Sequence, residues 1–186
     1  MRIIVLGATG MAGTAVVNEA LSRGHEVTAV SRRRRHRAGA GVTSCLLDVT
    51  DVGSVAGLLK ESDAAVVALR PPAGHEGDLV RLTEAVLDAA SRSRTPLLII
   101  GGAAPLSSPS DPGTLAIDDP TIVPPAWKDV AQASLDQFRA CQALGYEGWV
   151  YLSPPAILPP RNHHASAGRP RRIPHQPRGP CSRRRR

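Results

Sequence analysis

The chain has 186 residues, of which 42% are apolar and only 3% aromatic, and its formal net charge is +7. This length suits one domain with its own core, and no apolar run approaches the roughly eighteen residues of a membrane span, which excludes a helical membrane protein. The N-terminus enters a strand pattern without a signal peptide, and the cysteines at 45, 141 and 181 have neither disulfide nor metal-ligand spacing. We therefore expect a cytoplasmic protein without a metal site.

The positive charge belongs to the C-terminal end of the chain. Nine of the 23 basic residues lie within 159–186, where there is no acidic residue, so 1–158 hold 14 basic and 16 acidic groups and a net charge of −2. The domain itself is close to neutral.

The first thirteen residues carry the strongest functional pattern. Ile3 to Leu6 is a short apolar run that predicts a buried strand. Glycines follow at 7, 10 and 13, and this G-x-x-G-x-x-G is a variant of the dinucleotide fingerprint. Glycine allows the sharp turn, the close approach of a pyrophosphate and the tight packing of helix on strand, while the helix N-terminus offers unpaired N–H groups to the phosphates. The pattern predicts a dinucleotide site.

The rest of the domain alternates short apolar strand patterns with amphipathic helix patterns. Gly24 is expected to end the first helix and Asp51 to cap the second. Six prolines fall between 103 and 126, and so long a loop in a compact domain is usually a lid or a binding loop. Strands are predicted over 3–6, 25–30, 42–47, 64–69, 97–100 and 149–152, and helices over 14–22, from Asp51, over 77–91 and over 127–144.

This alternation predicts an α/β, Rossmann-like, doubly wound fold: one parallel sheet in the order 3-2-1-4-5-6 with helices on both faces. Ligands bind such sheets outside the carboxyl ends of the strands, at the switch point between strands 1 and 4. We therefore expect the cofactor at the loops that open on this edge, which follow Leu6, Val30, Leu47, Leu69 and Ile100.

Residues 1–158 resemble the atypical short-chain dehydrogenase/reductases, specifically the NmrA-like and flavin-reductase-like NAD(P)H-binding proteins. The segments that carry the resemblance are Gly7-Ala8-Thr9-Gly10-x-x-Gly13, Arg23-Gly24-His25-Glu26-Val27-Thr28, Asp48-Val49-Thr50-Asp51, Gly101-Gly102-Ala103 and Tyr151-Leu152-Ser153-Pro154-Pro155.

The resemblance implies NAD(P)H bound along the strand ends. It implies that several members reduce flavins, quinones or similar acceptors, whereas others bind the nucleotide and act as redox-responsive regulators. By the same resemblance, Gly7, Thr9, Gly10 and Met11 lie against the pyrophosphate, and Asp48 and Val49 lie at the adenine. The expected cofactor site is completed by the residues at the other strand ends and in the first helix, Gly13, Leu69, Gly101 and Gly102.

The choice of cofactor follows from the residues after the second strand. NAD-specific sheets place an acidic residue there to accept a hydrogen bond from the ribose 2′-hydroxyl. This chain has Ser31-Arg32-Arg33 and no carboxylate. Because a guanidinium pairs bidentately with a phosphate, we expect NADP(H) to be preferred over NAD(H), with Arg32 and Arg33 at the 2′-phosphate. A solvated basic loop is the alternative interpretation, and it is favoured for Arg34, Arg35 and Arg37.

The chain lacks the usual proton donor of short-chain dehydrogenases, because neither Tyr146 nor Tyr151 begins a Tyr-x-x-x-Lys. The remaining candidates are Lys128, which follows a tryptophan in a region where this branch often carries an aromatic and a lysine, and His75 after the fourth strand. A surface lysine and a solvated loop are the alternatives.

The residues are compatible with two functions. The first is an NADPH-dependent reductase of a small planar acceptor of the flavin or quinone type, which takes its proton from water. The second is a non-catalytic, NADP(H)-sensing regulatory protein.

Residues 159–186 differ in character from the domain, with arginine and proline but no hydrophobic period, which predicts a disordered tail. It is either an arm for nucleic acid or an acidic surface, or the product of a frameshift in a GC-rich gene. The second interpretation is favoured, because the change falls just past a family motif, where a further strand and helix are expected.

Overall fold

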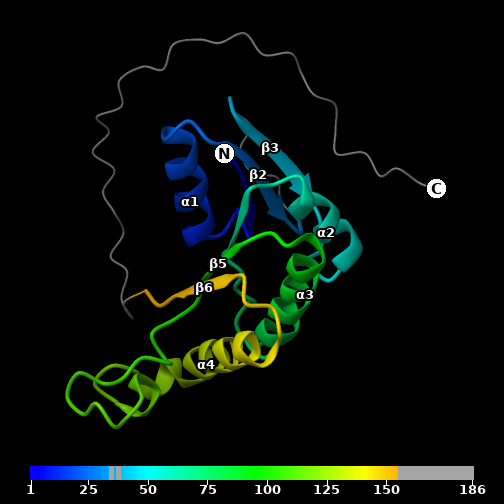
Figure 1. The fold of residues 1–186 in the computed structure, drawn as a ribbon. Helices are drawn as coiled ribbons and strands as arrows, with labels where there is room; N and C mark the ends of the chain where they lie inside the picture. The colour runs from blue at the N-terminus through cyan, green and yellow to red at the C-terminus, as the bar shows by residue number, and fades with distance from the viewer. Residues whose placement is uncertain (34–35, 37–38, 155–186) are drawn as a thin grey trace.

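Six parallel strands form one sheet in the order β3-β2-β1-β4-β5-β6, which confirms the predicted fold class and topology (Figure 1). The computed structural model describes residues 1–33, 36 and 39–154. The predicted tail, 159–186, and Arg34, Arg35 and Arg37 lie outside the described residues. The strands are β1 (Arg2–Leu6), β2 (Glu26–Ser31), β3 (Val42–Leu46), β4 (Ala64–Val67), β5 (Leu97–Ile100) and β6 (Trp149–Leu152).

Four α-helices connect the described strands. They are α1 (Met11–Ser22), α2 (Val52–Lys60), α3 (Asp78–Ser93) and α4 (Lys128–Ala143). The first begins one turn earlier than predicted, because Gly13 lies inside the helix rather than before it. The predicted ends of α1 and start of α2 are confirmed: Gly24 has a φ of +77°, and the Asp51 carboxylate accepts the Ser54 N–H.

The two faces of the sheet are covered unequally. Successive side chains of β1 point to opposite faces, so Val5 joins Val17 of α1 while Ile4 and Leu6 join the larger core beneath α2, α3 and α4. Figure 1 shows α1 on one side of the sheet and α2 and α3 on the other. The helix α1 contacts β1, β2 and β4, and on the same face of the sheet no described residue covers Val150 and Leu152 of β6, which are 64% and 48% exposed.

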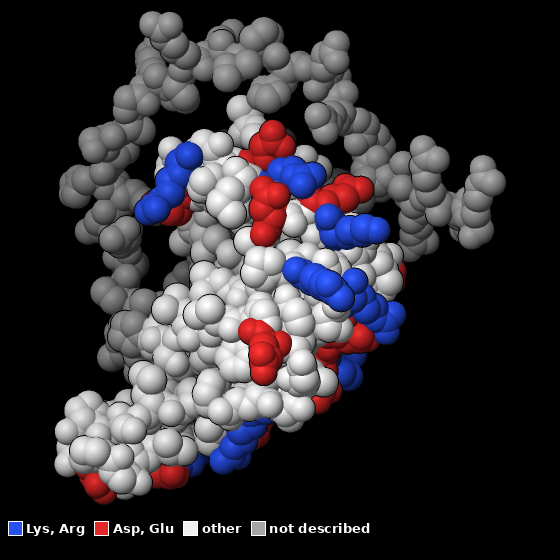
Figure 2. All heavy atoms as spheres, in the orientation of Figure 1, with Lys and Arg blue, Asp and Glu red and all other residues white. Residues whose placement is uncertain are grey.

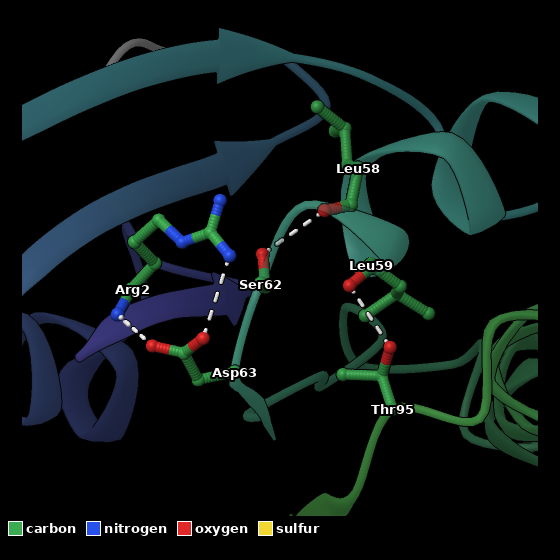
Figure 3. Close-up of polar contacts among 6 residues, drawn as sticks. All are labelled: Arg2, Leu58, Leu59, Ser62, Asp63 and Thr95. Carbon is green, nitrogen blue, oxygen red and sulfur yellow. Dashed lines mark hydrogen bonds and ion pairs between the residues drawn. The ribbon is translucent and has the colours of Figure 1, made fainter.

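Polar contacts fix the strand starts at the edge of the sheet opposite the predicted site (Figure 3). The Arg2 N–H donates to the Asp63 carboxylate over 2.7 Å, which joins the start of β1 to the start of β4. The hydroxyl of Thr95 donates to the carbonyl of Leu59 over 2.9 Å, which joins the approach to β5 to the last turn of α2. These bonds hold together the edge of the sheet at which the strands begin. The predicted site lies at the opposite edge, among the loops that follow the strands.

The segment 103–126, predicted to be a loop, has ordered structure of its own. Ser107 pairs with Leu115 in a short antiparallel bridge, and two 3-10 turns follow, η1 (Ala116–Asp118) and η2 (Pro125–Trp127). Ala104 and Ile117 pack with Leu135 of α4 in a small separate core. The segment projects beyond the sheet, at the lower left of Figure 1.

The Asp119 carboxylate accepts four hydrogen bonds within this segment. Asp119 is 8% exposed and accepts hydrogen bonds from the hydroxyls of Ser108, Ser110 and Thr121 and from the Thr121 N–H, at 2.6 to 2.9 Å. These donors, the Ser108 hydroxyl above all, hold the pKa of Asp119 far below its ordinary value of 3.8. The stabilisation is therefore complete above about pH 4 and is lost as the pH falls below that value.

We expect Asp119→Asn to lower the free energy of unfolding at pH 7, and to lower it less at pH 3, because the wild type has by then lost part of the same stabilisation. Urea unfolding at the two pH values measures the difference. Asp129→Asn is the control, since Asp129 is exposed and accepts no hydrogen bond from a described residue. An equal effect of Asp119→Asn at both pH values would contradict the assignment.

Candidate functional site

The turn after β1 requires glycine at position 7. Gly7 has a φ of +85°, and a Cβ there would strike the main chain of Ala68 after β4. The N–H groups of Gly7 and Ala8 both donate to the carbonyl of Val30 over 3.0 Å, which ties the turn to the end of β2. The turn thus lies where β1, β2 and β4 meet at their carboxyl ends.

The other two glycines of the fingerprint, Gly10 and Gly13, differ in the room that a Cβ atom would have. A Cβ on Gly13 would overlap the carbonyl of Gly7 and lie 2.9 Å from the Cα of Ala8, so only glycine lets α1 approach the strand this closely. A Cβ on Gly10 would meet only the Gly7 oxygen, at 3.4 Å. Position 10 therefore needs no glycine for the fold, and its bare backbone stays open on the outside of the turn.

The N-terminus of α1 is built to receive an anion. Gly10 caps the helix without a side chain, and its first turn has no acidic residue. Among the described residues nothing accepts from the N–H groups of Met11, Ala12 and Gly13, because the first turn of a helix has no intrahelical acceptors. The helix dipole adds positive potential at the same point. These donors, with Thr9 and Met11 at the rim, fit a pyrophosphate.

The loops after β2 and β3 bring a cation and an anion together. The N–H and hydroxyl of Thr50 donate to the Asp48 carboxylate at 3.0 and 2.8 Å. These bonds hold the pKa of Asp48 below its ordinary value, and attraction from the Arg32 guanidinium lowers it further. Arg32 and Arg33 are exposed, whereas Val49 is buried in the main core beneath this corner.

The glycines after β5 have a packing role that the sequence interpretation missed. A Cβ on Gly101 would enter the ring of Tyr151, and one on Gly102 would lie 3.1 Å from the Cβ of Ser134 in α4. The Gly102 N–H reaches the Tyr151 oxygen at 3.4 Å. Leu69, after β4, packs against the main core. Gly101 and Gly102 thus admit Tyr151 between β5 and α4, and the pairing of two glycines with a later tyrosine was the only signal in the sequence.

Tyr151 joins three elements through a buried polar chain. Its hydroxyl donates to the Ser134 carbonyl over 2.9 Å and lies 3.2 Å from the side-chain oxygen of Gln137, whose amide donates to Thr83 in α3 over 3.1 Å. Burial raises the pKa of Tyr151. The rings of Tyr151 and Trp149 both meet Phe138 of α4 edge to face.

The two candidate catalytic residues bind neighbouring chain segments. The ammonium of Lys128 donates to the carbonyl of Ile117 over 2.7 Å and to the Asp118 carboxylate over 3.3 Å, which anchors η1 to the start of α4. His75 is exposed, with its Nδ1 atom 4.0 Å from the Asp78 carboxylate. Neither side chain contacts the turn of Gly7, so a catalytic role for either stays a prediction.

A small cavity lies on the loop after β4, and this loop begins with Ala68, the residue whose main chain approaches Gly7. The cavity has a volume of about 120 Å³ and lies between the loop after β4 and the first turns of α3 and α4. Its walls are Arg70, Pro71, Ala73, Glu76, Leu79, Val130 and Ala133. A larger, open hollow of about 770 Å³ lies beside Pro96 and Gly148, which precede β5 and β6, and so at the edge of the sheet away from the turn.

In the described part of the chain, no three histidine, cysteine or acidic side chains gather as a metal site would need. Burial raises the pKa of the Cys141 thiol to about 11, so it stays protonated at neutral pH. Within 1–33, 36 and 39–154, no helix has the length and apolar character to cross a bilayer.

Comparison with known proteins agrees with this geometry. The model of a family described as NAD(P)H-binding matches residues 7–175. The "Uncharacterized protein YwnB" of Bacillus subtilis is 30% identical over 161 residues, which are 86% of this chain and 74% of that protein.

Two solved structures share both fold and sequence with the chain. A "putative exported protein" from Burkholderia pseudomallei is 32% identical with a TM-score of 0.71, over 83% of this chain and 72% of its own. A "putative NADH-flavin reductase" from Streptococcus pneumoniae is 27% identical with a TM-score of 0.66, over 83% of this chain and 71% of its own.

We expect Gly13→Ala to lower the free energy of unfolding by about 1–3 kcal/mol, because main-chain atoms must move to admit the methyl group. Gly10→Ala is the matched control, with an expected loss of under about 1 kcal/mol, since the position has room and loses only a modest capping preference. Urea unfolding of the two variants measures both values. A larger loss for Gly10→Ala would overturn the assignment of the close contact to position 13.

Proposed function

We propose that this chain, which belongs to the NAD(P)H-binding family, is an NADPH-dependent reductase of a small planar acceptor of the flavin or quinone type. The observation that carries the proposal is the uncapped N-terminus of α1, set beside the loop that holds Arg32. A phosphate-binding helix end and an arginine at the end of β2 are what an NADPH-binding sheet requires.

The residues of the chain divide the binding of NADPH between them. The N–H groups of Met11, Ala12 and Gly13 bind the pyrophosphate, and the glycine at position 10 lets the phosphates approach. Arg32 has no carboxylate within 4 Å among the described residues, so its guanidinium is available for the 2′-phosphate. Asp48 attracts this guanidinium electrostatically without forming an ion pair with it.

The reaction then needs little further from the protein. Bound NADPH supplies a hydride, and a hydride with one proton from solvent reduces a quinone to the hydroquinone and leaves NADP⁺. The contribution of the chain is to hold the cofactor in position, through the turn after β1 and the open N-terminus of α1. The name of the pneumococcal protein, with 27% identity, supports an acceptor of the flavin type.

Oxidation of NADPH by the purified chain, followed at 340 nm against a panel of flavins and quinones, tests the reductase. Turnover with at least one acceptor is expected. Stabilisation of the chain by NADPH without turnover across the panel would overturn the reductase and favour the alternative, a regulatory protein that senses NADP(H).

We expect Arg32→Gln to weaken NADPH binding by about 10- to 100-fold and to leave NADH binding within about twofold, because a hydrogen bond to a charged group contributes about 1.5–3 kcal/mol. Arg33→Gln should have a smaller effect. The control is Arg23→Gln, which removes an exposed arginine paired with Glu19. Titrations by calorimetry measure these constants, and an equal loss for the two cofactors would argue against a 2′-phosphate contact.

A further inference from the structure

The small cavity on the loop after β4 has an apolar floor and a charged mouth. Leu79 and Ala133 are each only 8% exposed, and Pro71 is buried as well. The charged side chains are Arg70 and Glu76, and both stand on the loop between β4 and α3. A floor of this kind holds a ring, while the mouth determines which substituents the ring can carry.

The loop that forms the mouth is held by its own hydrogen bonds. The Glu76 carboxylate accepts the Gly74 N–H over 3.1 Å, and the carbonyls of Pro72 and His75 accept the N–H groups of His75 and Asp78, each over 3.0 Å. The carboxylate of Glu76 is thus engaged within the loop. These bonds hold the loop in the conformation that forms the cavity.

Arg70 differs from most arginines of the described surface. Figure 2 shows basic and acidic side chains next to one another along the side of α2 and α3. Five described arginines form ion pairs, and these are Arg2, Arg23, Arg81, Arg92 and Arg139. Arg70 has no ion pair or hydrogen bond with a described residue, although it stands at the mouth of a cavity. Its five N–H donors are available to a planar anion.

The volume of the cavity sets the size of the ligand. An apolar cavity of about 150 Å³ encloses a whole benzene ring, so one of about 120 Å³ takes most of a single ring and leaves the substituted edge of that ring at the mouth. A three-ring flavin could insert only one edge of its ring system. The cavity therefore favours the quinone side of the acceptor class over the flavin side.

We propose that the acceptor is a single-ring compound with an acidic substituent, whose ring lies on Leu79 and Ala133 and whose carboxylate pairs with Arg70. The proposal deepens the proposed function and rests on it for the reaction, but the binding of the anion can be tested without turnover. Arg70 acts here as a specificity-determining residue.

Benzoate and benzamide are the first pair of probes, because they have the same ring and shape and differ in charge. Their binding to the full chain in the presence of NADP⁺ is measured by NMR titration. We expect benzoate to bind on the order of tenfold or more tightly than benzamide, and Arg70→Gln to abolish this difference. Arg139→Gln is the matched control, since it also removes one positive charge from the surface but lies on α4 in a pair with Asp136. Equal binding of the two probes to the wild type would overturn the proposal.

The second pair of probes is 1,4-benzoquinone and its 2-carboxylate, compared by kcat/KM after subtraction of the uncatalysed reaction. A preference for the carboxylate that is lost in Arg70→Gln supports the proposal. Reduction of both at equal rates, unaffected by Arg70→Gln, overturns it and leaves the reductase intact. A benzoate preference with no reduction of any quinone or flavin leaves the anion site intact and overturns the reductase.

Discussion

The structure depends on a close approach of backbones that no side chain would permit. Where β1 turns into α1, the missing Cβ atoms of Gly7 and Gly13 let the helix lie against the strand end and let the turn lie against Ala68. The same contact places the N-terminus of α1, with its open N–H groups, at the topological switch point of the sheet, between β1 and β4. The packing of the core and the phosphate site are therefore two results of one steric condition.

A second steric condition operates at the other end of the sheet. Gly101 and Gly102 make room for Tyr151, and Tyr151 connects β6 to α4 and, through Gln137, to α3. The cavity of Arg70 is bounded by the first turns of α3 and α4. A residue of the last described strand thus helps to hold the walls of a site formed mainly by residues far from it in sequence.

The sequence was sufficient for the parts of the structure that depend on local patterns. Strand runs such as 3–6, the cap at Asp51 and the glycine turn are each specified by residues within a few positions, and sheet order followed from right-handed crossovers. The sequence patterns do not indicate that segment 103–126 has ordered structure. The reason is that Asp119 accepts hydrogen bonds from residues both before and after it in the segment, and Ile117 packs on a helix that follows later in the chain. The sequence marks Tyr151 as part of a family motif and as lacking a lysine four residues on, but nothing near it indicates a contact with the glycine pair fifty residues away.

The distribution of aromatic residues gives this protein an unusual optical signature. All five, Trp127, Phe138, Tyr146, Trp149 and Tyr151, fall within 25 consecutive positions, and three of them form the edge-to-face cluster between α4 and β6. Near-ultraviolet absorption and emission of the side chains therefore come from η2, α4 and β6 and the loop between α4 and β6, whereas the glycine turn and the loops after β2 and β3 have no aromatic side chain. Intrinsic fluorescence will report on the packing of β6 and α4 and stay blind to the unfolding of the opposite half, which backbone circular dichroism or isotope labelling must follow instead.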